Sequence, residues 1–365
     1  MSTVKASKVM GWRVLPLALL AGTAALALTT RPDAGWRDVL DTPAAPSALA
    51  QRGLFNGLGR AGERLVAVGQ RGHVLWSDDQ GQGWHQAQVP VGSDLLAVSF
   101  AGAAQGWAVG HDGVVLHSQD GGQSWLRQLD GRELGHLVKD HYQPGADLGL
   151  SAEQQAFWQR EAGRFADQGA EASFLDVWFE DERTGYVVGA FGLILRTRDG
   201  GRHWEPLMHR LDNPKSLHLY AVRRVGGALY VVGEQGLVLR QEGAEGRFRA
   251  LDLPYQGTLF GIAGSGPAIV VHGLRGHVLR STDAGISWQS VPTGLEVGLT
   301  GSATGRDGRL VLVSQAGHLL VSEDAGASFQ TLALDRPQPA ASVLEAAPHR
   351  YVVAGPRGVD VRTLR

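Results

Sequence analysis

The stretch Val66–Trp84, VAVGQRGHVLWSDDQGQGW, decides the fold, because the chain repeats it. Two more clear copies are WAVGHDGVVLHSQDGGQSW (Trp107–Trp125) and YVVGAFGLILRTRDGGRHW (Tyr186–Trp204). Worn copies follow at Tyr230–Phe248, Val270–Trp288, Leu312–Phe329 and Tyr351–Arg362. One repeat position is occupied in turn by Gly69, Gly110, Gly189, Gly233, Gly273, Ser314 and Gly355, with gaps of 41, 79, 44, 40, 41 and 41 residues. A period near 40 made of short strands and turns predicts an all-β, seven-bladed β-propeller, with one copy per blade.

The second copy shows how each repeat forms a blade. Alternating apolar residues predict an innermost strand at Asp94–Phe100, and two further strands follow at Gly106–Gly110 and Val114–Ser118. The tight turn His111–Gly113 separates these two strands, and its glycine permits a positive φ. The outer strand is expected at Trp125–Leu129.

The turn before the outer strand carries the Asp-box pattern S/T-x-D-x-G-x-x-W/F. The hydroxyl and the carboxylate can accept backbone N–H groups of the turn, and the aromatic ring can pack between blades. The five matches are Ser77/Asp79/Gly81/Trp84, Ser118/Asp120/Gly122/Trp125, Thr197/Asp199/Gly201/Trp204, Ser281/Asp283/Gly285/Trp288 and Ser322/Asp324/Gly326/Phe329. The fourth copy, Gln241–Phe248, keeps only the aromatic residue.

The two ends of the chain predict how the ring closes. The seventh copy ends at Arg365, before any outer strand, and Gly35–Leu40 (GWRDVL) resembles an outer strand with its Trp. We therefore expect residues 36–41 to complete the last blade. Pairing the first strand with the last would remove two exposed sheet edges.

The N-terminus reads as an export signal, residues 1–28. Lys5, Lys8 and Arg13 precede the apolar stretch Val14–Leu28, and Ala25–Ala27 is a small-x-small cleavage site. The propeller then occupies residues 29–365, and an uncleaved signal would anchor it to the membrane. The sequence contains no cysteine, which excludes a disulfide, a thiolate metal site and a cysteine-linked lipid.

These features favour a periplasmic protein. Loss of the signal removes three basic residues and leaves a net charge of −5, which argues against nucleic acid as a partner. We expect a monomer.

The 79-residue gap contains an insertion at residues 131–170, between the second and third blades. Ser151 followed by Gln154 predicts a helix start, and the helix carries Phe157, Trp158 and Phe165. In a four-stranded blade, the connection between blades shares one face of the disc with the turn between the second and third strands. Because loops of this length are usually functional, Phe157 and Trp158 are candidate partner-binding residues. The alternative is that the helix only packs on the neighbouring blades.

Three turns on that same face carry arginine at one equivalent position, namely Arg71, Arg275 and Arg357. Asp112 and the nearby Glu234 occupy the turns of blades 2 and 4. A face with a basic side could bind a partner, or the arginines could be solvated turn residues.

A second arginine series ends the third strand of three consecutive blades, at Arg196, Arg240 and Arg280. It could bind an anionic partner, or its members could be packed and paired locally at blade borders. His73, His277 and His318 also recur at one repeat position, but on different blades, so no shared metal site is expected. Each Asp-box offers one carboxylate, which is too few oxygens for a calcium site. We predict no cofactor.

An enzyme of the sialidase type is the main catalytic alternative, since such enzymes are Asp-box propellers. They carry an Arg-Ile-Pro tripeptide in the first blade, and this sequence has none. Three of the six tyrosines, Tyr186, Tyr230 and Tyr351, share one structural repeat position. No nucleophile-elbow, phosphate-binding or dinucleotide motif is present. We predict no catalytic residues.

The motif VVGxxGxILRTxDGGxxW at Val187–Trp204 resembles the photosystem II stability/assembly factor family. The resemblance covers nearly the whole chain after the signal. It implies an exported seven-bladed propeller without catalysis that binds a membrane subunit through an arginine-bearing face, with Arg196, Arg240 and Arg280 in the matching positions. The long insertion and the worn blades 4, 6 and 7 depart from the family pattern.

We therefore predict a non-enzymatic exported scaffold that binds a membrane protein complex from the periplasmic side. In a host without photosystems, the resemblance implies an accessory protein of a membrane transporter of the resistance-nodulation-division type. The alternative function is that of an Asp-box carbohydrate-binding protein or glycosidase.

Overall fold

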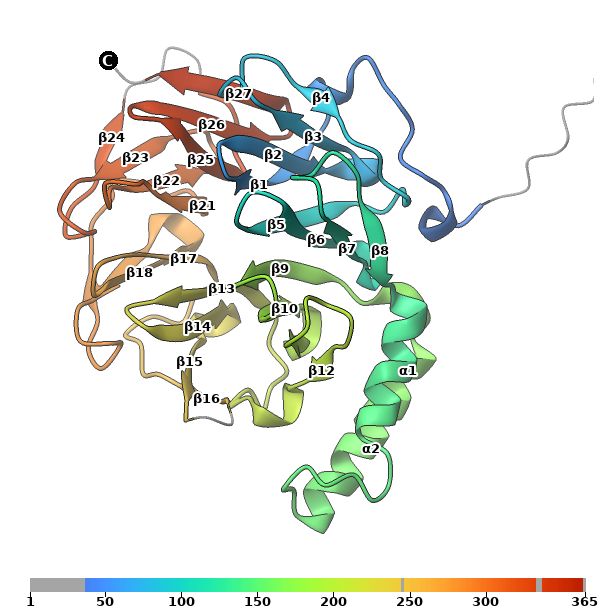
Figure 1. Cartoon of the computed structure of the whole chain (residues 1–365). Coiled ribbons are helices and arrows are strands. Elements are labelled where there is room, and N and C mark those ends of the chain that lie inside the picture. The colour runs from blue at the N-terminus through green and yellow to red at the C-terminus, as the bar shows by residue number, and fades with distance from the viewer. Residues whose placement is uncertain (1–36, 244–245, 333–336, 364–365) are drawn as a thin grey trace, which may run out of the picture. The chain divides into compact units, whose positions relative to one another are not determined.

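The computed structural model describes residues 37–243, 246–332 and 337–363. The described residues from Asp38 onwards form one compact unit. Seven antiparallel sheets surround a common centre in this unit (Figure 1). The predicted signal at residues 1–28 lies outside the described residues.

Within each sheet the strands follow chain order from the centre outwards. The first three blades are β1 (Phe55–Ala61), β2 (Arg64–Gly69), β3 (Val74–Ser77), β4 (His85–Gln86); β5 (Leu95–Ala101), β6 (Gln105–Gly110), β7 (Val115–Ser118), β8 (Leu126–Leu129); and β9 (Phe174–Phe179), β10 (Gly185–Gly189), β11 (Ile194–Thr197), β12 (Glu205–Pro206). The next two are β13 (Leu219–Val225), β14 (Ala228–Gly233), β15 (Val238–Glu242), β16 (Arg247–Ala250); and β17 (Leu259–Ser265), β18 (Ala268–Gly273), β19 (Val278–Ser281), β20 (Gln289–Ser290). The last two are β21 (Leu299–Thr304), β22 (Leu310–Ser314), β23 (Leu319–Ser322), β24 (Gln330–Leu332); and β25 (Ser342–Ala347), β26 (Arg350–Gly355), β27 (Gly358–Thr363).

Two α-helices form the insertion, and short 3-10 turns complete the fold. The α-helices are α1 (Gly131–His141) and α2 (Ala152–Asp167). The 3-10 turns are η1 (Val39–Asp41), η2 (Ala50–Arg52), η3 (Gln70–Gly72), η4 (His111–Gly113), η5 (Gly169–Glu171), η6 (Ala190–Gly192), η7 (Met208–Arg210), η8 (Glu234–Gly236) and η9 (Leu274–Gly276). No helix in the described ranges is long and apolar enough to cross a bilayer.

The core consists of apolar layers between neighbouring blades. All five residues of β10 are buried, and its alternate side chains point to opposite faces of the sheet. Val187 packs in the layer between blades 2 and 3, and Val188 packs in the layer between blades 3 and 4. A strand covered on both faces must be apolar at successive positions, which explains the VAVG, WAVG and YVVG segments of the repeat.

The repeated glycine at the end of the second strand is required by a close backbone approach. Gly273 has an extended backbone, with φ −171°, so its conformation alone would accept any residue. A Cβ atom there would, however, overlap the carbonyl oxygen of Thr258, which accepts a hydrogen bond from the N–H of Leu274 at 3.0 Å. The same overlap would arise at Gly69, Gly110, Gly189, Gly233 and Gly355.

The turns that carry the Asp-box pattern share one set of hydrogen bonds. In blade 5 the Ser281 hydroxyl donates to Asp283 at 2.8 Å and accepts the N–H of Gly285 at 2.8 Å. Asp283 also accepts the hydroxyl and the N–H of Ser287, and these bonds, with that of Ser281, lower the pKa of its carboxyl to about 2. The indole of Trp288 donates to the Gly285 carbonyl at 3.1 Å. Hydrogen bonds among its own residues therefore hold the turn in shape.

The ring does not close in the way the sequence predicts. The outer strand expected at residues 36–41 is absent from the described part of this segment: Val39–Asp41 form the 3-10 turn η1, and Leu40 is buried in the layer between blades 1 and 2. Among the described residues the last sheet has three strands, β25, β26 and β27. Blade 1 meets blade 7 through packing of β1 against β25 and β26, and the turn η2 contacts β27.

The reason for this difference is local hydrogen bonding. The Asp38 carboxylate accepts the N–H of Leu40 at 2.9 Å, and the Asp38 carbonyl accepts the Thr42 hydroxyl at 2.8 Å. These bonds favour a tight turn over an extended strand.

The glycine constraint predicts a large loss of stability for Gly273→Ala. The added methyl group must displace the Thr258 carbonyl, and we expect the free energy of unfolding to fall by about 2 kcal/mol or more. Urea denaturation measures this. Gly163→Ala is the matched control, because Gly163 lies in α2 and an added Cβ there would meet no atom within 4 Å beyond its chain neighbours and the backbone of its own helix. Alanine there should leave stability unchanged or raise it by up to about 1 kcal/mol. Equal effects of the two substitutions would contradict the constraint.

Candidate functional site

The two arginine series lie on opposite faces of the propeller. In the five blades with an Asp-box, the third strand starts after a turn such as η3 or η9 and ends at the Asp-box turn, and blades 4 and 7 have the same strand direction. We call the face with the turns η3, η4, η6, η8 and η9 the loop face, and the other the Asp-box face. Arg71, Arg275 and Arg357 therefore belong to the loop face, and Arg196, Arg240 and Arg280 lie toward the Asp-box face. The structure does not bring the two series together.

Two of the three arginines of the loop face project from strained turns. Arg71 and Arg275 have φ values of 57° and 54°, in the left-handed region that non-glycine residues rarely adopt. Both side chains are exposed, as is that of Arg357. The Asp94 carboxylate accepts the backbone N–H of Arg71 at 2.7 Å, so this turn is fixed through its main chain while the guanidinium stays free to face solvent.

Two of the other three arginines are engaged inside the protein. Arg196 is 6% exposed, and its guanidinium donates to Glu205 on the neighbouring strand β12 at 2.5 Å. Arg280 donates from Nε to the Ala325 carbonyl, in the Asp-box turn of the next blade, at 2.8 Å. Arg240 is half-buried. Arg196 thus donates to an acceptor within its own blade, and Arg280 donates to an acceptor in the next blade.

The insertion begins at a buried carboxylate. Asp130 is 2% exposed and is the N-cap of α1, accepting the N–H groups of Arg132 at 2.9 Å and Glu133 at 3.2 Å. Burial raises the pKa of Asp130, but the bonds from Arg132 and Glu133 outweigh it and hold the pKa below its ordinary value. The helix expected from the sequence begins at Ser151 and leaves α1 out, although Asp130 followed three residues later by Glu133 is a helix-start signal.

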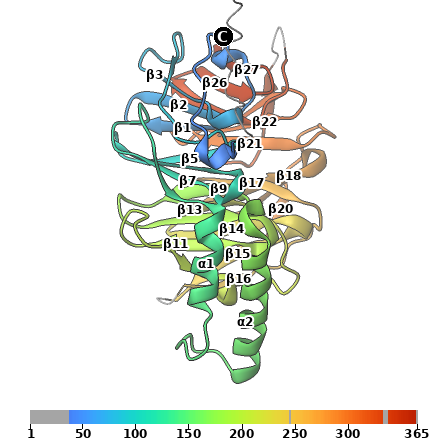
Figure 2. The same ribbon diagram turned by 90° about the vertical axis from the view of Figure 1, so that its right-hand side faces the viewer.

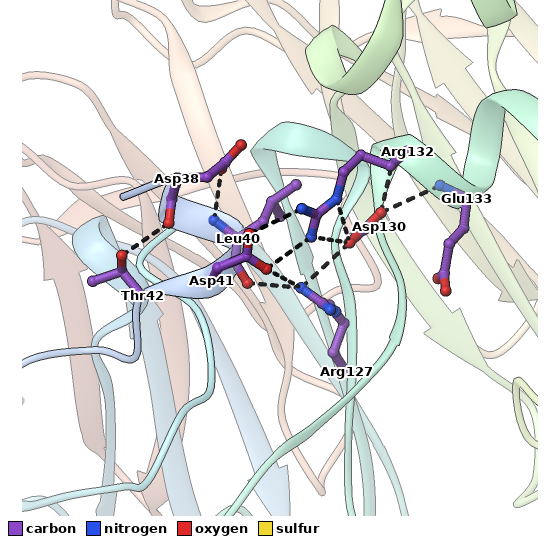
Figure 3. A network of polar contacts seen from close by, with 8 residues as sticks. All are labelled: Asp38, Leu40, Asp41, Thr42, Arg127, Asp130, Arg132 and Glu133. Atoms are coloured by element: carbon purple, nitrogen blue, oxygen red, sulfur yellow. Dashed lines mark hydrogen bonds and ion pairs between the residues drawn. The ribbon is translucent and has the colours of Figure 1, made fainter. Parts of the chain in front are cut away.

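The Asp130 carboxylate and two arginines also link the N-terminal segment to the insertion (Figure 3). The Arg132 guanidinium binds both Asp130 and Asp41, with distances of 2.8 and 3.0 Å. Arg127 donates to the Leu40 carbonyl at 2.7 Å and lies 3.3 Å from the Asp130 carboxylate. One buried carboxylate and two arginines therefore fix strand β8, helix α1 and the turn η1 relative to one another.

The two helices form an antiparallel hairpin at the outer edge of blade 3 (Figures 1 and 2). The predicted start of α2 is present as a capping box, in which the Ser151 hydroxyl accepts the N–H of Gln154 and the Gln154 side chain accepts the N–H of Ser151. On the blade side, α1 buries Leu134 and Val138, and α2 buries Ala162.

The hairpin and the loop face of blade 3 enclose a cavity of about 270 Å³. Aromatic side chains from three elements line it: Trp158 and Phe165 from α2, Tyr142 from the end of α1, and Phe191 from η6. Trp158 stacks on Tyr142, with ring centroids 5.3 Å apart. Phe157 lies beside Trp158 and is 46% exposed.

Tyr142, at the end of α1, bonds to His209 in η7, the turn that follows β12 of blade 3, and we call this contact the histidine joint. The backbone N–H of His209 donates to the Tyr142 hydroxyl, and the His209 Nδ1 lies 2.9 Å from the same oxygen. Arg210 donates to the His209 Nε2, so the neutral ring carries its proton on Nδ1 and donates it to Tyr142. Burial, and then the nearby charges of His141 and Arg210, lowers the pKa of His209 to about 4. Burial also lowers the pKa of His141, whose ring centroid is 5.6 Å from that of His209.

The three histidines of the repeat stay apart and bond locally. His73 contacts the Ala45 carbonyl at 3.2 Å, His277 the Leu274 carbonyl at 3.0 Å, and His318 the Ser314 hydroxyl at 2.9 Å. Within the described part of the chain, no three His, Asp or Glu side chains gather in a way that could hold a metal ion.

Comparison with known proteins places the chain in a family. The model of the family Photosynthesis system II assembly factor YCF48 matches residues 61–136 and 151–337, which is more than half of the chain. The chain belongs to this family. The resemblance inferred from Val187–Trp204 is thereby confirmed. Residues 137–150, in the insertion, lie outside the matched ranges.

One curated relative is the Photosystem II assembly lipoprotein Ycf48 of Synechococcus sp. (strain CC9902), 30% identical over 131 residues. The match covers 35% of this chain, which spans about two fifths (39%) of the relative's length.

Solved structures of similar fold include YCF48 bound to D1 peptide, with a TM-score of 0.62, 18% identity, and 86% of this chain and 94% of that chain covered. YCF48 from Cyanidioschyzon merolae has a TM-score of 0.60 and 18% identity, with 88% and 98% covered. The WD40 β-propeller domain of Doa1 has a TM-score of 0.57 at 10% identity, with 88% and 95% covered. At these identities the structures support the propeller fold alone.

The histidine joint predicts a pH-dependent stability. His209 stays neutral in the folded chain, whereas an unfolded histidine titrates near its ordinary pKa of about 6.5. Because only the unfolded chain takes up the proton, the free energy of unfolding should fall as the pH drops from about 6.5 towards 4. The Asp-box carboxylates contribute little in this window, because the pKa values of Asp283 and Asp324 are about 2.

Chemical denaturation between pH 7.5 and 4.5 tests this. His209→Asn should lower the slope of stability against pH relative to the wild type. His136→Asn, at an exposed position of α1, should leave the slope unchanged. If both variants keep the wild-type slope, the joint does not titrate as argued.

Proposed function

We propose that this chain is an exported, non-enzymatic scaffold that binds a subunit of a membrane protein complex and supports assembly of that complex. The observation that carries the proposal is the family match over residues 61–136 and 151–337. The solved relative described as YCF48 bound to D1 peptide favours a peptide segment of the partner as the bound element.

The loop face is the proposed contact surface. It offers the exposed guanidinium groups of Arg71, Arg275 and Arg357, and the aromatic residues Phe157 and Trp158 lie in the helical hairpin beside it. Exposed charges of one sign steer a partner of opposite charge, and aromatic side chains supply most of the contact energy at interfaces.

For Arg196 and Arg280 we propose a structural role as the main one, within blade 3 for Arg196 and between blades 5 and 6 for Arg280, and Arg240 is half-buried at the equivalent position. Arg196 and Arg280 already donate to Glu205 and to the Ala325 carbonyl, so an anionic partner would have to compete with bonds inside the protein. A role in direct partner contact would require these arginines to be released first.

The export signal predicted at residues 1–28 supports a periplasmic location, and we propose that the chain acts there as a monomer. No observation on the fold or the relatives favours a transporter-accessory role, a carbohydrate-binding role or a glycosidase over the assembly role. We therefore propose the assembly role alone.

Affinity capture from detergent-solubilised membranes of the host tests the proposal, with the tagged full-length chain as bait and identification of the retained proteins. We expect one membrane protein complex to be retained. Replacing Arg71, Arg275 and Arg357 together by serine should lower its recovery by roughly tenfold, from about 0.2–1 kcal/mol per exposed charge.

The matched control replaces Arg183, Arg198 and Arg202, three exposed arginines near the Asp-box face, and should leave recovery within about twofold. Recovery of no membrane protein by the wild type would overturn the proposed function. Equal losses for the two triple variants would overturn the choice of face.

A further inference from the structure

The cavity under the helical hairpin is shaped for a side chain. Its volume of about 270 Å³ lies below the range of roughly 300–1,000 Å³ that is usual for small-molecule sites. Most of its lining is apolar, with Trp158, Phe165 and Phe191 joined by Met208 and Leu211. A pocket of this kind suits one large apolar side chain presented by another polypeptide.

Phe191 is the feature that the propeller itself does not explain. It occupies the central position of η6 with φ 56°, and it is 71% exposed. The equivalent residues of blades 1, 2, 4 and 5 are all polar, namely Arg71, Asp112, Gln235 and Arg275. A bulky aromatic residue in the left-handed region is strained, and an exposed one gains little from burial. Its one ring contact in the described residues is an edge-on approach to His218 at 4.7 Å.

The charge at the cavity indicates the chemistry of the occupant. The two charged residues in the lining are Glu161 and Arg164, which form an ion pair through one terminal nitrogen of the guanidinium. The carboxylate is thereby occupied, but the guanidinium has five N–H donors and its side chain is 71% exposed. The lining therefore offers unused donors and no unused carboxylate, which favours an acidic group on the ligand.

We propose that this cavity receives one aromatic or branched apolar side chain from an extended segment of the partner membrane protein, with a neighbouring carboxylate of that segment bound by Arg164. The ligand side chain then covers the exposed ring of Phe191, which forms one wall of the cavity. This inference rests on the proposed function and names the chemistry that the hairpin adds to the loop face.

The chain provides a specific reporter for the experiment. It has three methionines, and Met208 lines the cavity, whereas Met1 and Met10 lie in the N-terminal 36 residues. Full-length protein labelled with ¹³C at the methionine methyl groups is titrated with blocked hexapeptides that differ at two central positions. These positions carry Asp-Phe, Lys-Phe or Asp-Ala.

We expect the Asp-Phe peptide to shift the Met208 methyl signal saturably. The Lys-Phe peptide should bind roughly tenfold more weakly, and the Asp-Ala peptide should leave the signal unmoved. Arg164→Gln should bring Asp-Phe binding down towards that of Lys-Phe, whereas Arg160→Gln, at an exposed position one turn earlier in α2, should not change it. Phe191→Ser, which restores a polar residue at an exposed turn, should weaken Asp-Phe binding by roughly fivefold or more.

An unmoved Met208 signal with all three peptides would overturn the proposal, as would equal binding of Asp-Phe and Asp-Ala or equal effects of the two arginine variants. The outcome is separable from that of the assembly role. If Phe191→Ser captures the membrane complex as well as the wild type does, the cavity is not the contact and the proposed function stands. If the wild type captures no membrane protein, the proposed function fails whatever the peptides do.

Discussion

The close contact between the end of the second strand and the carbonyl before the first strand is the constraint on which each regular blade depends. In blade 5, Gly273 leaves room for the Thr258 carbonyl, and Leu274 then donates its N–H to that oxygen. This bond fixes where the second strand stops and where the tight turn η9 begins. Because the contact recurs in six blades, the turns of the loop face stand at equivalent places while their side chains remain free to differ.

The sequence contains this constraint as a period, and for that reason the blades could be predicted closely. Glycine spacing, apolar segments and Asp-box residues all encode contacts within one repeat or between adjacent repeats. The N-terminal segment has no such repetition. Its short apolar and polar alternation fits a strand as well as a turn, and the choice is made by Asp38, which binds the N–H of Leu40, and by Arg127, which binds the Leu40 carbonyl. Arg127 is 87 residues from Leu40 in sequence, so no local pattern could reveal this contact.

The candidate site was only partly predictable, for the same reason. The Ser151 and Gln154 pair marks the start of α2, and Asp130 with Glu133 would have marked α1. The cavity, however, requires α2 to lie against η6 and the segment after β12, and these contacts join residues far apart in the chain. The sequence signal for the cavity lies in a comparison of the equivalent turns between the second and third strands of the blades. Phe191 stands where the sister blades carry Arg71, Asp112, Gln235 and Arg275, and a strained, exposed aromatic residue at a polar position points to a contact outside the blade.

The blades and the helical hairpin are held in place differently, and this favours the hairpin as the part that adapts to a ligand. Each blade is held on both faces by a neighbouring blade, so movement of one sheet would disturb two apolar layers. The hairpin, by contrast, is fixed at its base by the buried Asp130 and at the end of α1 by the bond between Tyr142 and His209. Between these two points α1 packs on the blades through Leu134 and Val138, whereas α2 borders the cavity beside blade 3. A ligand side chain would therefore complete a layer that the protein leaves unfinished, without disturbing the blades.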